Sequence, residues 1–129
     1  MGLGESMQDR ISFLHTLATQ NPHPESVPIN LLHRVAGTPL EVQKPLEFWE
    51  FLRTIAAARV LMPQAMVRLS AGRISLSIEQ QALCFLAGAN SLWLGEKLLT
   101  VPNPDIDRDE EMLSLFGFKK RAAYARAQP

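Results

Sequence analysis

The sequence has little cysteine and no long apolar run, and both absences narrow its class. Cys84 is the single cysteine in 129 residues, which excludes an internal disulfide and any multi-cysteine metal site built from this chain alone. Because Cys84 lies in an apolar segment, we expect a buried side chain rather than a metal ligand. The longest apolar run, residues 82–89, is far shorter than the roughly 20 residues that span a bilayer. The opening residues MGLGE lack the basic and apolar regions of a signal peptide.

An excess of charge of one sign is also lacking. Thirteen lysines and arginines balance 13 aspartates and glutamates, and 47% of the residues are hydrophobic. Without a basic excess or a block of like charges, the sequence does not favour nucleic acid or an anionic membrane as a partner. The composition is that of a cytoplasmic globular protein, and the length suffices for one core of modest size. We therefore expect one cytoplasmic domain that binds neither nucleic acid nor a membrane.

Hydrophobic periodicity predicts helices that alternate with strands. Helices are expected over residues 6–20, 46–61, 77–87 and 107–116, and strands over residues 26–31, 67–71 and 90–94. This order implies right-handed βαβ crossovers and a parallel sheet. The predicted fold class is α/β, with three parallel strands and four helices.

Capping residues and apolar spacing predict where the helices begin and which sides face the core. Ser6 with Asp9, and Ser77 with Gln80, have the spacing of capping boxes, and Gly88 is expected to end the third helix. In the first helix, helical spacing is followed by Met7, Ile11, Leu14, Leu17 and Ala18. The second helix is expected to carry inward Leu46, Trp49, Leu52, Ile55, Ala56 and Val60.

All three strands alternate aliphatic residues with polar ones. In the second strand Val67 and Leu69 point one way and Arg68 points the other. The polar phase of the other strands contains Ser26, Pro28 and Asn30, and then Ser91 and Trp93. We expect helices to cover the aliphatic face. The other face is too polar for the filled interior of a typical (β/α)₈ barrel and suggests an open cavity that holds a ligand.

Arg68 is the residue on this face that most needs a partner. A buried guanidinium requires an acidic group, a phosphate or a metal cluster, and Arg68 has no carboxylate on its own strand. A buried ion pair with a residue elsewhere and a ligand site both remain open. Asn30 and the serines at 26, 70 and 91 either line that site or, as the pattern favours, satisfy backbone groups at strand ends. No pair of histidines has metal-ligand spacing, and no nucleophile elbow is present.

Seven blocks of the sequence, from residue 2 to about 118, resemble biotin synthase and follow that family's order. The blocks are GLGE (2–5), SVPIN (26–30), GTPL (37–40), RTIA (53–56), VRLSAGR (67–73), CFLAGANS (84–91), and KLLT with PNP (97–100 and 102–104). The family is a radical S-adenosylmethionine (β/α)₈ barrel that inserts sulfur into dethiobiotin to form biotin. The resemblance covers its C-terminal part only. It implies that residues 1–118 are about the last three strands and four helices of that barrel, followed by a basic, mobile tail at 119–129.

The resemblance also implies roles for four residues. Arg68 matches the arginine that ligates the [2Fe-2S] cluster, which serves as the sulfur donor. Ser26 and Ser91 match strand residues near that cluster, and Asn30 matches a strand-end residue close to the substrate. A guanidinium is a poor ligand, so its use requires a dry site in which the charge of the cluster dominates the local field.

The sequence departs from the family at the cluster ligands. It lacks the CxxxCxxC loop for the [4Fe-4S] cluster that cleaves S-adenosylmethionine, and it lacks the three cysteines that complete the [2Fe-2S] site. Met1 falls where the fifth barrel strand ends, as in an internal start of an interrupted gene or an engineered fragment. In the full enzyme, a 5′-deoxyadenosyl radical abstracts hydrogen from dethiobiotin.

These departures lead us to expect that the chain alone has no catalytic residue of its own and is inactive. We expect it to self-associate or to need the N-terminal part of the barrel in trans. The alternative is a catalytically silent fragment or assembly partner.

Overall fold

A computed structural model of the chain describes residues 1–94, 97–98, 101–102 and 106–121. Its helices are α1 (Met7–Ala18), α2 (Phe48–Leu61), α3 (Ile78–Ala87) and α4 (Ile106–Leu115), with a short 3₁₀ turn at Arg73–Ser75. The strands β1 (Ser26–Ile29), β2 (Met66–Leu69) and β3 (Ser91–Leu92) form a parallel sheet in the order β1-β2-β3. The strands β4 (Lys97–Leu98) and β5 (Val101–Pro102) pair antiparallel in a separate hairpin, which the sequence did not predict. The predicted α/β class and parallel sheet are confirmed.

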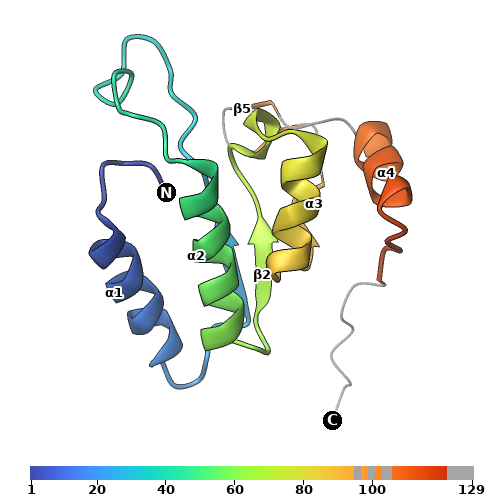
Figure 1. Ribbon diagram of the computed structural model, residues 1–129, viewed down its shortest axis with the longest axis horizontal. Coiled ribbons are helices and arrows are strands. Elements are labelled where there is room, and N and C mark those ends of the chain that lie inside the picture. The colour runs from blue at the N-terminus through green and yellow to red at the C-terminus, as the bar shows by residue number, and fades with distance from the viewer. Residues whose placement is uncertain (95–96, 99–100, 103–105, 122–129) are drawn as a thin grey trace.

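The helices lie mainly on one side of the sheet. α2 and α3 pass in front of β1 and β2, α1 lies beside α2, and α4 lies beyond α3 (Figure 1). The β4–β5 hairpin lies behind the sheet, on the side away from α2 and α3 (Figure 1). None of the helices in the part of the chain that the structure describes is long and apolar enough to cross a membrane.

The core forms where the aliphatic phase of the strands meets the helices. Val27 pairs with Val67, and Ile29 with Leu69, and all four side chains are buried. Ile55 of α2 packs against them and is also buried. Each such side chain contributes about 1.5–3 kcal/mol by leaving water. The predicted alternation therefore places the helix layer on the expected face of the sheet.

The predicted inward face of α2 is wrong in part. Ile55 is buried as predicted, but Trp49 and Val60 are 59% and 78% exposed, and the other buried positions of the helix are Phe51, Thr54 and Ala58. Residue 46 precedes the helix, which begins at Phe48. Because α2 is apolar around most of its circumference, periodicity does not single out one stripe, and contact with the sheet and α3 selects it.

The apolar residues of α1 that follow helical spacing are only partly buried. Leu14 is buried, but Met7 and Ile11 are 63% and 50% exposed. Arg10 is buried in their place, and its Nη2 atom donates to Glu50 Oε2 of α2 at 2.8 Å. An ion pair between buried Arg10 and half-buried Glu50 at this helix contact therefore displaces the apolar stripe. Both capping boxes are present as predicted, and Gly88 ends α3.

Pro28 lies in β1 without removing a bond to β2. The amide of Leu31 donates to Ala71 O at 2.9 Å, toward β2, whereas the amide of Leu32 donates to Met1 O at 2.9 Å on the opposite edge. Successive amides of a strand alternate in direction, so position 28 faces the same edge as position 32. The Met1 amino group also donates to the residue 30 carbonyl at 2.6 Å. Met1 therefore forms, just after β1, the two hydrogen bonds that a neighbouring parallel strand would form there.

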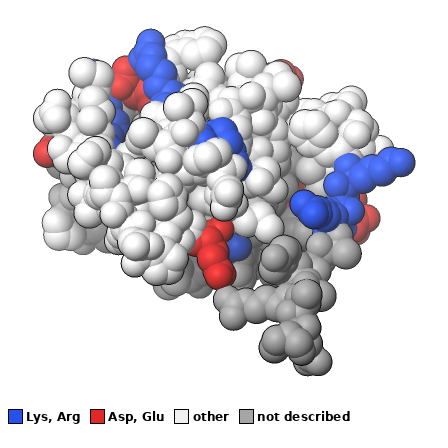
Figure 2. Space-filling model, turned by 90° about the horizontal axis from the view of Figure 1, so that it is seen from below, with Lys and Arg blue, Asp and Glu red and all other residues white. Residues whose placement is uncertain are grey.

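We expect the 129-residue chain on its own to self-associate rather than persist as a monomer. Within the described sheet, β1 and β3 are edge strands, and edges without charged side chains favour pairing between chains. Figure 2, a view from the amino-terminal ends of the strands, shows charged groups separated by broad uncharged areas. Large exposed apolar side chains include Met7, Phe13, Trp49, Val60, Leu86 and Leu115.

Sedimentation velocity on freshly purified protein measures this directly. The expected result is a distribution of oligomers that grows with concentration. A sharp monomer with a cooperative melt, as small two-state domains show, would contradict it.

Candidate functional site

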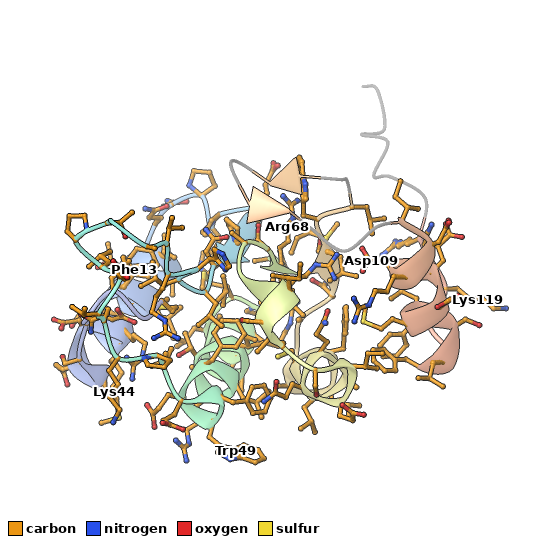
Figure 3. The ribbon with its side chains drawn as sticks, turned by 90° about the horizontal axis from the view of Figure 1, so that it is seen from above. Phe13, Lys44, Trp49, Arg68, Asp109 and Lys119 are labelled. Atoms are coloured by element: carbon orange, nitrogen blue, oxygen red, sulfur yellow. The ribbon has the colours of Figure 1, made fainter. Side chains whose placement is uncertain are left out.

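Arg68 and Ser91 meet on the sheet face opposite α2 and α3. Arg68 pairs with Pro28 on one side and with Ser91 on the other, and its Nε donates to Ser91 Oγ at 3.3 Å. Both side chains are half-buried. In Figure 3, Arg68 lies toward the β4–β5 hairpin, whereas Trp49 lies on the opposite, helix-covered side. The register predicted from strand alternation is therefore confirmed.

Ser26 and Asn30 lie on the same face, two residues to either side of Pro28, or about 6.6 Å along the strand. Ser26 Oγ donates to Met66 O at 3.5 Å. Asn30 Oδ1 accepts from the amide of Ala71 at 3.0 Å, which continues the β1–β2 ladder by one side-chain bond. The structure therefore brings the four predicted residues onto one face. It also gives Asn30 the strand-end role that its pattern favoured.

Arg68 has no acidic partner among the described residues within 4.0 Å, and Ser91 Oγ is the side-chain atom that it contacts. The buried ion pair that the sequence left open belongs instead to Arg73. Its guanidinium is 2% exposed and donates to Asp109 Oδ1 at 2.8 Å and to Asp109 Oδ2 at 2.5 Å. Two arginines five residues apart thus have different surroundings, and Arg68 is the one on the face opposite α2 and α3, toward the β4–β5 hairpin.

Sequence reasoning missed the Arg73–Asp109 pair. Arg73 lies in the VRLSAGR block at residues 67–73, but nothing in that block indicates a partner for it. A signal was present in α4, where Asp109 precedes Met112 by three residues. The two therefore share one helix face, and both are buried. A carboxylate on the buried face of a helix predicts a buried cationic partner.

Gly72 sets the turn between β2 and Arg73. Its φ is +84°, in the left-handed region that favours glycine. A Cβ at this position would lie 2.1 Å from Leu31 O and 2.9 Å from Leu31 Cβ. The turn after β2 is therefore in close contact with the segment after β1, beside Asn30.

Cys84 is not part of this face. It lies in α3 within the core, is 0% exposed, and burial raises the pKa of its thiol to about 12. A cysteine binds a metal ion as its thiolate. The protonated, buried thiol of Cys84 is therefore not suited to bind a metal ion. The described residues contain no group of three or more histidine, cysteine, aspartate or glutamate side chains that could hold a metal ion.

The raised pKa of Cys84 predicts a loss of stability at alkaline pH. In the unfolded chain the thiol ionises near pKa 8.5, whereas in the folded protein it keeps its proton to about pH 12. The unfolded chain is therefore the state stabilised as the pH rises above about 9, and the unfolding free energy falls by up to about 1.4 kcal/mol per pH unit. Urea denaturation at pH 8, 9 and 10 should show this slope reduced in Cys84→Ala. Equal slopes in the two proteins would contradict the assignment.

An open cavity of about 710 Å³ lies between the loop after β1 and the first turns of α2 and α3. Residues that line it include Leu31, His33, Glu47, Phe51 and Gln80. None of the four predicted site residues lines it. The predicted site is thus the sheet face itself, away from this cavity.

The fold and this face define an α/β protein with an open parallel sheet, covered by helices on one side and polar on the other. Residues 28–119 match the family described as Biotin and Thiamin Synthesis associated domain, and the chain belongs to this family. Its similarity to biotin synthase, expected from the sequence blocks, is confirmed.

Three curated relatives show the extent of this similarity. The chain is 60% identical over 124 residues to biotin synthase of Chlamydia pneumoniae, covering 96% of this chain and 38% of that protein. It is 63% identical over 117 residues to mitochondrial biotin synthase of Arabidopsis thaliana, covering 91% and 31%. It is 56% identical over 124 residues to biotin synthase of Cytophaga hutchinsonii, covering 96% and 37%. The chain therefore spans well under half the length of these relatives and corresponds to their C-terminal part.

Proposed function

We propose that this chain supplies the C-terminal part of a biotin synthase, the enzyme that inserts sulfur into dethiobiotin by radical chemistry. The observation that carries the proposal is the sheet face where Arg68 contacts Ser91 and has no acidic partner among the described residues. The similarity supports it, because 96% of the chain aligns at 60% identity with one biotin synthase. In this proposal, residues 1–118 form about the last three strands and four helices of the (β/α)₈ barrel of that enzyme.

We assign Arg68 as one ligand of the [2Fe-2S] cluster that donates sulfur in the full enzyme. Iron–sulfur clusters are held mainly by cysteine thiolates, and the only cysteine of this chain is buried in the core. The described residues therefore fit one ligand position and not a complete set. The other ligands, the [4Fe-4S] cluster and S-adenosylmethionine belong to the remaining part of the enzyme, in one polypeptide or in trans.

The position of Asn30 fits contact with the substrate. Asn30 directly follows Ile29, the last residue of β1, and ligands of parallel α/β sheets bind at the carboxyl ends of strands. Ser26 and Ser91 lie on the same face and would line the cavity beside the cluster.

The proposed tail begins at residue 119. Lys119, Lys120 and Arg121 are exposed, and Lys120 forms an ion pair with Glu110 of α4. The remainder of the predicted tail, residues 122–129, lies outside the described residues.

A chimera tests the proposal. The segment of Chlamydia pneumoniae biotin synthase that aligns with this chain is replaced by residues 1–129, and the chimera is expressed in a bacterial strain that lacks its own biotin synthase. Growth without biotin is the expected result, and the same relative truncated before the exchanged segment is the control that does not grow. A soluble, folded chimera that fails to support growth would instead favour a silent fragment or an assembly partner.

A further inference from the structure

We propose that Arg73 is a positioning residue: held by Asp109 of α4, it fixes the end of β3 against β2 and so places the Ser91 hydroxyl beside Arg68. Its effect on β3 stands on the structure alone. Its consequence for biotin formation rests on the proposed function.

The guanidinium of Arg73 joins three elements at one buried point. Besides its two bonds to Asp109 of α4, Nη1 donates to Gln81 Oε1 of α3 at 3.2 Å, and Nη2 donates to Trp93 O at 3.3 Å, just after β3. Such a fork of donors matches a carboxylate in two parallel bonds and fixes its orientation. Arg73 therefore connects α4 to the end of β3 through one rigid group.

β3 is a short strand. It is two residues long and, in the described sheet, pairs with β2 through Ser91 with Arg68 and Leu92 with Leu69. Asn90, just before it, forms two bonds to the backbone of Val67. The amide of Trp93 donates to Leu69 O at 3.3 Å, and its carbonyl accepts from Arg73 on the other side. Residue 93 is thus held from both sides, two positions after the serine that accepts from Arg68.

α4 depends on the same ion pair. Within the described part of α4, Asp109 and Met112 are the buried residues. After the helix, Phe116 and Phe118 pack on Phe85 of α3 with ring centroids 6.4 Å and 5.3 Å away. Asp109 is the buried charged group in the described part of α4 and accepts from Arg73. A change at Asp109 should therefore reach β3 through Arg73.

A matched pair of substitutions tests this by hydrogen exchange with mass spectrometry. Asp109→Asn removes the carboxylate that faces Arg73, and Glu50→Gln removes the carboxylate that faces Arg10, the other buried arginine. We expect Asp109→Asn to speed exchange in α4 and at residues 91–94, and Glu50→Gln to speed it in α1 and α2 only. Faster exchange in α4 with residues 91–94 unchanged would overturn the proposal, since Asp109 would then anchor α4 alone.

Arg73→Lys separates the two contacts. An ammonium group keeps the charge for Asp109, but it lacks the fork that reaches two carboxylate oxygens and Trp93 O together. The expected result is partial protection of α4 with faster exchange at residues 91–94. Equal protection of residues 91–94 in Arg73→Lys and the unaltered chain would contradict the assignment.

The chimera then tests the consequence for the site. At equal amounts of folded protein, Asp109→Asn should lower the rate of biotin formation by about 10- to 100-fold, the range for residues that orient a metal ligand, and Glu50→Gln should leave it near the unaltered rate. Faster exchange at residues 91–94 with an unchanged rate would overturn the link between Arg73 and Arg68. If the unaltered chimera makes no biotin, the proposed function fails, and the exchange measurements still decide the role of Arg73 in the fold.

Discussion

Replacing Gly72 with alanine is expected to leave little or no folded protein. The new Cβ would lie 2.1 Å from Leu31 O, a backbone atom that cannot move without shifting the segment after β1. A φ of +84° adds the strain of a left-handed conformation, about 1–2 kcal/mol for an L-residue. Together these effects place the substitution among the exceptional losses of about 4 kcal/mol or more, a large share of the roughly 5–15 kcal/mol that stabilises a small domain.

Gly37→Ala is the matched control. Gly37 has a similar φ of +79°, but its Cβ would meet nothing within 4 Å. It should therefore lose only the backbone term, about 1–2 kcal/mol. Thermal melting and soluble yield of the two variants compare the costs. A melting temperature for Gly72→Ala equal to that of Gly37→Ala would show that Leu31 O does not approach this turn so closely.

The chain alone, reconstituted with iron and sulfide, is expected to form neither 5′-deoxyadenosine nor biotin. One buried cysteine with a raised thiol pKa cannot supply the thiolates of a cluster, and the described residues hold no other group of metal ligands. The chimera, reconstituted in parallel, is the positive control. Both products would be measured by liquid chromatography with mass spectrometry. Repeated turnover by the unaltered chain would contradict this expectation, because it would require a cluster site that the described residues do not contain.

The sheet could be predicted because its strands carry a clear alternation. Val67 and Leu69 allow only one face to be buried, and a register shifted by one residue would bury Arg68 under the helices. The two capping boxes have side chains at fixed spacing and form within a single turn, so Ser6 and Ser77 marked the helix starts correctly.

The helix faces could not be predicted in the same way. α2 carries apolar residues on several sides, so its buried stripe is decided by its contacts with the sheet and α3. Trp49 lies outside that stripe and is exposed. On α1, Arg10 is buried because Glu50 is available on α2, a contact across 40 residues of sequence. The β4–β5 hairpin has two residues in each strand, too few for a periodic signal.

The sequence predicted which residues share the polar face of the sheet, but not which residues pair with Arg68 and Arg73. Alternation placed Arg68, Ser91 and Ser26 together, whereas the partner of each arginine depends on tertiary distances. Arg73 and Asp109 are 36 residues apart and meet only because the turn after β2 and α4 converge. That convergence gives Arg73 the ion pair that the sequence left open for Arg68.

We propose Arg68 as the cluster-facing residue of this chain, and Arg68→Met in the chimera is the most direct test of this role. Arg53→Met is the control, because Arg53 is exposed on α2 with its side chain 71% accessible and lies outside the site. The measurement is the visible absorption spectrum of the reconstituted chimera, recorded together with the biotin formed per protein. We expect an altered spectrum of the [2Fe-2S] cluster for Arg68→Met, and an unaltered spectrum and biotin yield for Arg53→Met. A spectrum and a biotin yield for Arg68→Met that match those of the unaltered chimera would contradict it.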